Sequence, residues 1–347
     1  MARKNTIRLL LGLLALLFIV AAAIVWPYYR SIYVEGVPEK LENPFVHIPT
    51  GSTYEDVVYI LKNGGYITDE PSFRWVAEEM KYNKPVMRAG RFEIKPGWSN
   101  RELIQHLRTG EQSPVKLVLN MERLPEEVAG KAARFLESDS LALLKTFGDP
   151  NVLQELGYTP ETLISLFIPN TYEMFWNTDP KSFLKRMKKE NESFWAKNGR
   201  LEKAKALGLS PVEVYTLASI VDRESNVNEE KPRIAGVYLN RLRVGMRLQA
   251  DPTSVFATRD FGATRVTDYH TTFDSPYNTY VYYGLPPGPI SMASIPGLEA
   301  VLNPEQHDYI FFCAKPDDSG AHAFAVTYAA HLVNVDKFKA YLAKRGN

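Results

Sequence analysis

The longest run of apolar residues lies at the N-terminus, where residues 9–26 contain no charged side chain. A run of about 18 apolar residues just reaches the length that spans a bilayer as a helix. Basic residues precede the run, and a basic flank favours a cytoplasmic N-terminus. These patterns predict a cytoplasmic tail over residues 1–8, one transmembrane helix over residues 9–26, and export of the remaining chain. The basic residues are Arg3, Lys4 and Arg8.

A cleaved signal peptide is the alternative to a permanent anchor. Residues 21–23 are all alanine, and small residues of this kind form the cleavage site of signal peptides. The run is long for the apolar core of a signal peptide, and Trp26 and Tyr28 follow it as interfacial aromatic residues do. We therefore expect an uncleaved anchor, and both alternatives place the remaining chain outside the cytoplasm.

Two later segments, residues 48–64 and 94–110, repeat one pattern of polar and apolar positions. Each has a turn with proline and glycine, then a capping box, an apolar helical stripe and a closing glycine. The pattern predicts two strand–turn–helix units, with a further helix over residues 71–82 and a strand over residues 91–94. The matched positions are Gly51 with Gly97, Thr53 with Ser99, Asp56 with Glu102, Leu61 with Leu107, and Gly64 with Gly110.

The strand, the Pro-Gly turn and the capped helix make residues 44–115 similar to the LysM fold, a small carbohydrate-binding module. A small α/β spacer domain that binds no glycan is the alternative. We expect residues 27–43 to be a linker and residues 116–347 to form a larger mixed α/β domain. The predicted fold class is therefore α+β, with a transmembrane helix, a small LysM-like domain and the larger domain.

The segment from Ser210 to Ser225 is predicted to be the central helix of the larger domain. Ser210 and Glu213 form a capping box, and Pro211 suits the first helical position. An apolar stripe follows at helical spacing, and Glu224 continues it because it lies three to seven residues after each member. The stripe consists of Leu217, Ile220 and Val221.

A carboxylate on an apolar stripe is partly removed from water, which raises its pKa and suits it to general acid catalysis. Glu224 is therefore the candidate acid. Asp222 points away from the stripe and is not expected to share this role. The alternative is that Glu224 only ends the helix, where it meets solvent.

Loops rich in proline and glycine follow the central helix, and we expect them to hold a ligand against its end. They cover residues 240–253, 276–280 and 284–290. The remaining elements predicted in the larger domain are a strand over residues 115–119, helices over 231–243, 295–302 and 331–344, strands over 309–314 and 322–326, and a polar loop over 258–274.

Composition removes several classes of function. Lys and Arg number 41 against 40 Asp and Glu, and a net charge near zero argues against nucleic acid as a partner. The six histidines are scattered and Cys313 is the only cysteine, so we expect no metal site and no intrachain disulfide. Sequence motifs of serine hydrolases, phosphate loops and zinc proteases are missing. Acid–base chemistry by a carboxylate remains, with Glu224 and Asp251 as the candidates.

Five blocks in this order make the chain similar to the YceG-like family. They are residues 217–225, 240–242, 245–253, 277–280 and 284–290. The resemblance implies a single-pass enzyme of the inner membrane whose catalytic domain, residues 116–347, faces the periplasm or cell wall. It also implies that the enzyme needs no cofactor and cleaves the β-1,4 bond between N-acetylmuramic acid and N-acetylglucosamine within nascent peptidoglycan strands.

By the same resemblance Glu224 is the catalytic acid and base of a lytic transglycosylase, which leaves 1,6-anhydro ends. One carboxylate is enough, because the C6 hydroxyl of the muramic acid attacks its own C1, whereas ordinary glycosidases use two carboxylates. Peptidoglycan synthases are the partner proteins that the resemblance implies. The residues expected to position the glycan or to orient Glu224 are Asn240, Gln249, Asp251, Tyr277 and Asn278.

Two positions depart from the family pattern. Asn170 stands where an acidic residue is common, and Ala321 interrupts a Gly-Gly-His motif, which leaves His322 as a possible cleft residue. Two other functions stay open. One is a hydrolytic muramidase with Glu224 as acid and Asp251 as base, and the other is a membrane-anchored scaffold that binds glycan without cleaving it.

Overall fold

The computed structural model describes residues 2–34 and 36–345 and divides into two compact units. The first unit holds the chain up to Val115 together with Glu173–Thr178, and the second holds Lys116–Tyr172 and the chain from Asp179 onward. The sheets of the described residues are two-stranded and the remaining elements are mostly helices, so the protein is a mixed α and β protein.

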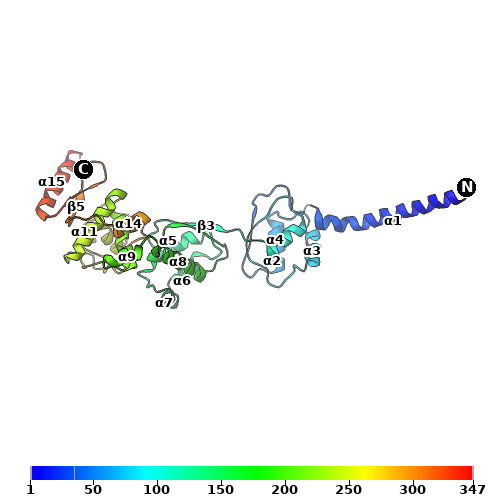
Figure 1. The fold of residues 1–347 in the computed structure, drawn as a ribbon, viewed down its shortest axis with the longest axis horizontal. Helices are drawn as coiled ribbons and strands as arrows, with labels where there is room; N and C mark the ends of the chain where they lie inside the picture. The colour runs from blue at the N-terminus through cyan, green and yellow to red at the C-terminus, as the bar shows by residue number, and fades with distance from the viewer. Residues whose placement is uncertain (1, 35, 346–347) are drawn as a thin grey trace. The chain divides into compact units, whose positions relative to one another are not determined.

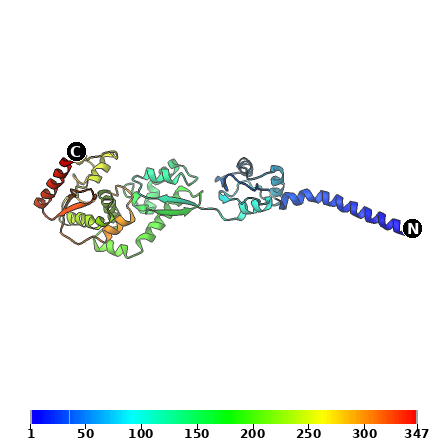
Figure 2. The ribbon, with the colours of Figure 1, turned by 90° about the horizontal axis from the view of Figure 1, so that it is seen from above.

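The predicted N-terminal helix is present as α1 (Ala2–Tyr33), one continuous helix in Figures 1 and 2. Its stretch from Ile7 to Tyr33 is long and apolar enough to cross a membrane, and none of its most apolar window is buried in the protein. The helix runs seven residues beyond Trp26, where we expected a linker, and it contains Pro27.

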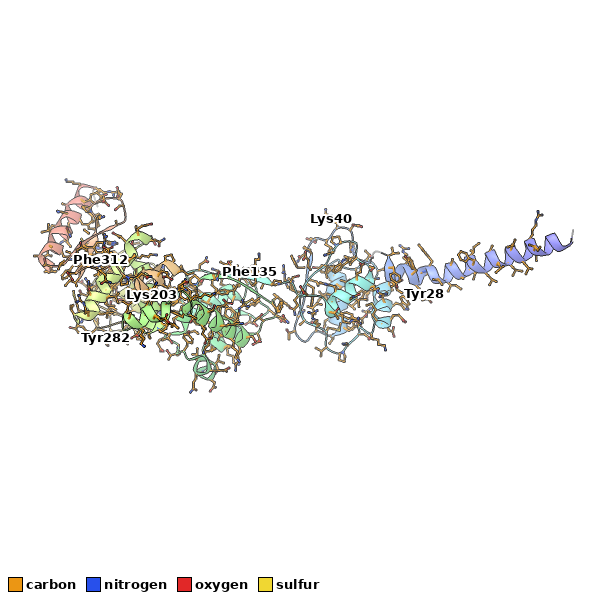
Figure 3. The ribbon with its side chains drawn as sticks, in the orientation of Figure 1. Tyr28, Lys40, Phe135, Lys203, Tyr282 and Phe312 are labelled. Carbon is orange, nitrogen blue, oxygen red and sulfur yellow. The ribbon has the colours of Figure 1, made fainter. Side chains whose placement is uncertain are left out.

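The rest of the expected linker is also structured. Val37 is fully buried in the core of the first unit, and its N–H donates to the carbonyl of Trp98 at 2.8 Å. The ring of Tyr28, labelled in Figure 3, lies 5.1 Å from that of Trp75 on α3 (Glu70–Glu79), measured between centroids. Tyr28, Gly36 and Val37 therefore contact the first unit, so part of the expected linker is structured.

The two strand–turn–helix units are confirmed in the first unit. β1 (Phe45–Ile48) leads to α2 (Tyr54–Asn63), and β2 (Gly90–Glu93) leads to α4 (Asn100–Thr109), with α3 (Glu70–Glu79) between them. The strands pair antiparallel, with Phe45 opposite Glu93 and Ile48 opposite Gly90. Both repeat helices start with a complete capping box, and both turn glycines have positive φ angles.

The closing glycines of the repeat act differently from the prediction. Gly64 and Gly110 have φ angles of −79° and −66°, so neither forms a left-handed helix stop. Both positions exclude a side chain, because an added Cβ would lie 2.5 Å from the Tyr66 ring at Gly64 and 2.2 Å from the His106 ring at Gly110. Close approach of a side chain explains these glycines.

The second unit begins with the predicted strand β3 (Val115–Leu119), which pairs with β4 (Asn170–Met174). Between and after these strands come short helices, which Figure 1 shows in green beside β3. They are α5 (Pro125–Ala132), α6 (Ser140–Phe147), α7 (Pro150–Leu156), η1 (Leu163–Leu166), α8 (Pro180–Trp195) and α9 (Arg200–Ala206).

The central helix is α10 (Pro211–Glu224), and its capping box is present as predicted. Residues from Val214 to Asp222 are buried, and α10 packs against α11 (Lys231–Arg243), α12 (Asp251–Thr258) and α14 (Ile295–Leu302). The remaining elements are η2 (Asn228–Glu230), α13 (Asp268–Thr272), the hairpin of β5 (Phe311–Ala314) and β6 (His322–Ala325), and α15 (Tyr328–Lys344).

The prediction of a polar loop over residues 258–274 is wrong in part. Residues 268–272 form α13, which begins after Thr267 with a capping box that uses the ring of His270. The sequence pattern of a capping box was hidden because histidine takes the place of the usual acidic residue.

Candidate active site

Glu224 is the last residue of α10, and its surroundings make it a weak acid. Its Oε1 accepts a 2.6 Å hydrogen bond from the hydroxyl of Tyr238, a fully buried residue of α11. The pKa of Glu224 is raised from 4.5 to about 7, chiefly by burial and also by the negative charge of Asp251. The Tyr238 hydrogen bond and the charge of Arg241 act in the opposite direction. Glu224 therefore holds a proton in much of the population near neutral pH.

Asp222 has a structural role, in agreement with its predicted direction away from Glu224. Its carboxylate accepts hydrogen bonds from Lys231 Nζ at 2.7 Å and from the backbone N–H and the hydroxyl of Ser294 at 2.6 and 2.7 Å. Since Lys231 begins α11 and Ser294 caps α14, this carboxylate joins three helices. The junction fixes the end of α10 from which Glu224 projects.

Two cavities meet at Glu224 and Asp251. The larger, of about 450 Å³, has two arginines and two phenylalanines in its wall. The smaller, of about 230 Å³, has mostly polar walls. An extended ligand can therefore contact Glu224 from both sides. Besides Glu224 and Asp251, the larger is lined by Arg123, Arg223, Pro252, Val255, Phe256, Phe261, Ala263 and Ile290, and the smaller by Arg241, Gln249, Tyr280, Phe312, Cys313, Ala314 and His322.

Asp251 and Gln249 are positioned to contact a ligand in the cavities. Both line the smaller cavity, and Asp251 also lines the larger. The Oδ1 of Asp251 accepts a 2.5 Å hydrogen bond from the hydroxyl of Tyr280. Gln249 has a left-handed φ of +48°, and its N–H donates to the carbonyl of Thr279 at 3.1 Å. The chain before α12 is thus held to the segment that carries Tyr280.

Three predicted site residues lie outside both cavities. Tyr277 packs its ring 4.8 Å from that of Phe256, between centroids. Asn278 is fully buried and donates to the carbonyls of His270 and Phe273 at 2.9 and 2.8 Å. Asn240 donates to backbone carbonyls of residues 307 and 309 and lines a separate cavity of about 840 Å³ beside α11. Their surroundings favour structural roles over glycan contact.

Several residues of the site were missed from the sequence. Tyr238 and Arg241 lie three residues apart on a predicted helix, and this spacing is a signal that could have placed both against Glu224. Tyr280 lies in the sequence block 277–280, from which the prediction named Tyr277 and not Tyr280. His322 does line the smaller cavity, and its Nδ1 lies 2.9 Å from Oε2 of the buried Glu230. Arg123 carries no local signal, because it comes from about 100 residues before Arg223 in the chain.

The described residues contain no group of three or more histidine, cysteine, aspartate or glutamate side chains arranged to hold a metal ion. Acid–base groups, aromatic rings and arginines are the chemical resources of the two cavities. An acid of raised pKa between two cavities is suited to protonating a leaving oxygen in the middle of a long substrate.

Comparisons with known proteins identify the family of the chain. The sequence profile of the YceG-like family matches residues 46–337. A protein of Bacillus subtilis (strain 168) named endolytic murein transglycosylase is 28% identical over 314 residues, which cover 84% of each chain. A Streptococcus pneumoniae protein of the same name is 26% identical over 299 residues, which cover 78% of this chain and 54% of that protein.

A solved structure gives the same result at the level of the fold. The crystal structure of a YceG-like protein from Listeria monocytogenes is similar with a TM-score of 0.56 and 27% sequence identity. The similarity covers 83% of this chain and 97% of that chain. Because the family profile covers most of the sequence, the chain belongs to the YceG-like family.

Proposed function

We propose that this protein is an endolytic murein transglycosylase with Glu224 as its acid and base. The observation that carries the proposal is the position of Glu224 between two cavities, with burial raising its pKa to about 7. The names of the relatives from Bacillus subtilis and Streptococcus pneumoniae support the reaction class. The substrate is the glycan strand of peptidoglycan, cut at an internal bond between N-acetylmuramic acid and N-acetylglucosamine.

The reaction needs one carboxyl group. Glu224 donates its proton to the oxygen that links C1 of the muramic acid to the next sugar, and the C1–O bond breaks. The C6 hydroxyl of the same muramic acid attacks C1, and its proton passes to the Glu224 carboxylate. The products are a 1,6-anhydro ring and a free 4-hydroxyl group, so no water is consumed and Glu224 is protonated again. The internal nucleophile supplies proximity without an ordered water.

Tyr238 and Asp251 influence the orientation and the pKa of the Glu224 carboxyl group. The hydrogen bond from Tyr238 fixes one oxygen of Glu224, which leaves the other free to face a ligand. Asp251 raises the pKa of Glu224 by its charge, and Tyr280 in turn holds Asp251. The fully buried Tyr238 acts as a positioning residue in this scheme.

A hydrolytic muramidase is the second candidate, because Asp251 lines both cavities with Glu224 and could activate water. Mass spectrometry of uncrosslinked glycan strands after incubation with the full chain separates the two. The transglycosylase gives 1,6-anhydro ends, which are lighter than the reducing ends of a hydrolase by one water. Reducing ends would replace the proposed reaction with hydrolysis, and strands that are retained uncut would support the scaffold.

We also propose how the chain is placed in the cell. α1 anchors it in the inner membrane, and the basic residues before the apolar run favour an N-terminus in the cytoplasm. The two units then face the periplasm or cell wall, where nascent strands are found. The order β1, α2, α3, β2 supports a LysM-like, glycan-binding role for the first unit. Peptidoglycan synthases are the proposed partners, because they produce those strands.

A further inference from the structure

The larger cavity beside Glu224 contains two positive charges without a balancing ion pair. Arg123 and Arg223 both line this cavity, and no ion pair to either is found within residues 2–34 and 36–345. Arg223 is partly buried, and its guanidinium has only two long contacts, to the Ser291 hydroxyl at 3.3 Å and the Met121 carbonyl at 3.4 Å. The Arg123 guanidinium lies 4.2 Å from the centre of the Phe261 ring.

Two other arginines in the same unit show direct pairing with a carboxylate. Arg200, which is nearly buried, pairs with Glu299 at 2.7 Å, and Arg233 pairs with Glu305 at 2.9 Å. Burial and the charge of Arg123 lower the pKa of Arg223, so the two cations oppose each other within the protein. The charges of Asp222 and Glu127 favour the Arg223 cation, but neither carboxylate pairs with it directly. The Asp222 carboxylate is bound by Lys231 and Ser294, and that of Glu127 accepts from the backbone N–H of Arg123 at 2.6 Å. A partly buried cation pair without a direct carboxylate partner is stabilised when an anion binds there.

We infer that Arg123 and Arg223 bind a carboxylate of the peptide attached to the muramic acid next to the cleaved bond. This inference rests on the proposed function, which places a murein strand against Glu224. The sugars of murein are uncharged N-acetylated sugars, and the negative charges lie on the carboxyl groups of the attached short peptide. Arginine forks bind carboxylates in two-point contacts, and aromatic rings such as Phe256 and Phe261 in the same wall suit the sugar faces.

The position of the pair explains why the carboxylate would aid the reaction. Arg223 is the neighbour of Glu224 in the chain, and both face the same cavity. An anchored peptide fixes the muramic acid, whose C1 and C6 atoms react, relative to the Glu224 carboxyl group. The enzyme would therefore select strands whose peptides carry free carboxyl groups over strands whose peptide carboxyl groups are blocked as amides.

Equilibrium binding of full-length Glu224→Gln protein in detergent tests this selectivity without cleavage. The probes are fluorescent uncrosslinked strands of one length, with native peptides, with the peptide carboxyl groups converted to amides, and with the peptides removed by amidase, which leaves a lactyl carboxylate on each muramic acid. We expect strands with native peptides to bind at least about tenfold more tightly than the amidated strands, as fits a charge-assisted contact. Adding Arg223→Gln should reduce that preference to within about threefold, and adding Arg123→Gln should reduce it in the same direction.

Arg259→Gln is the matched control. Arg259 is exposed and lies over the Phe256 ring at 4.7 Å, but it does not line the cavity. The Arg259→Gln substitution removes one positive charge close to the cavity, and we expect the preference for strands with native peptides to remain.

Three results would overturn the inference. They are equal affinity for native and amidated strands, an equal loss of preference in Arg259→Gln, and a preference that is unchanged in Arg223→Gln. Thermal unfolding of each variant checks that it is folded. Cleavage by the chain with native Glu224, measured separately, reports on the proposed reaction, so the failure of one proposal is distinguishable from the failure of the other.

Discussion

Glu224 reaches its raised pKa by opposing influences that single substitutions can separate. Burial and the charge of Asp251 raise the pKa to about 7, while the Tyr238 hydrogen bond and Arg241 lower it. The protonated form is the one that donates to the leaving oxygen, so the form needed for catalysis is lost as the pH rises through the pKa. The rate kcat/KM should accordingly fall above about pH 7.

Asp251→Asn removes a negative charge that raises the pKa of Glu224, so the alkaline fall of kcat/KM should move to lower pH. Tyr238→Phe removes a hydrogen bond that lowers this pKa, so the fall should move to higher pH. Rate profiles of the two variants between pH 5 and 9 (about two units either side of neutral) measure both shifts. Profiles that shift in the same direction, or not at all, would contradict the assigned role of Glu224.

At the level of elements, strong local signals allowed accurate prediction. The helices 231–243 and 295–302 and the strand 115–119 have the predicted bounds, because each has clear periodicity and clear ends. The site was predicted less well. Tyr238 lies 14 residues after Glu224, and Tyr280 lies 29 residues after Asp251, so only tertiary packing brings each tyrosine to its carboxylate. Local spacing can place Tyr238 and Arg241 on one face of a helix, but it does not show which residue that face meets.

The Asp222 junction predicts a large loss of stability. Lys231 is nearly buried, and Asp222→Ala would leave its charge without a partner, at a cost of about 3–5 kcal/mol. Urea unfolding of the full chain, followed by a probe in the second unit, measures this loss. Ser210→Ala at the start of the same helix removes a cap and should cost only about 1 kcal/mol. Equal losses in the two variants would argue against the junction.

Two helical glycines of the second unit should respond to alanine with opposite signs. Gly130 of α5 has no heavy atom within 4 Å of an added Cβ, so Gly130→Ala should stabilise by about 0.5–1 kcal/mol. At Gly236 of α11 an added Cβ would lie 2.7 Å from the carbonyl oxygen of Glu305 and 2.6 Å from the His307 ring, so Gly236→Ala should destabilise. Thermal unfolding compares both with the parent, and a shared sign would contradict the close approach at Gly236.

At the scale of the whole molecule, α1 is compatible with a membrane anchor. Its apolar stretch is unburied in the protein and long enough to span a bilayer. Changing Leu13, Leu16 and Phe18 together to lysine should release the chain from the membrane fraction, since each central charge costs about 2.5–3.5 kcal/mol on insertion. The same three positions changed to isoleucine are the control and should stay in the membrane.

The intact mass of the mature protein decides between an anchor and a cleaved signal peptide. We expect the mass of the uncleaved chain, because the apolar run is long and α1 continues through Trp26 to Tyr33. A mass that lacks the residues up to Ala23 would instead indicate cleavage.

The most direct measurement compares the full chain with its Glu224→Gln variant on uncrosslinked strands, with the product ends identified by mass spectrometry. The account predicts internal fragments with 1,6-anhydro ends from the parent and no cleavage by the variant, with both proteins equally stable to heat. Cleavage by Glu224→Gln at the parent's rate would remove Glu224 from the mechanism and contradict the account.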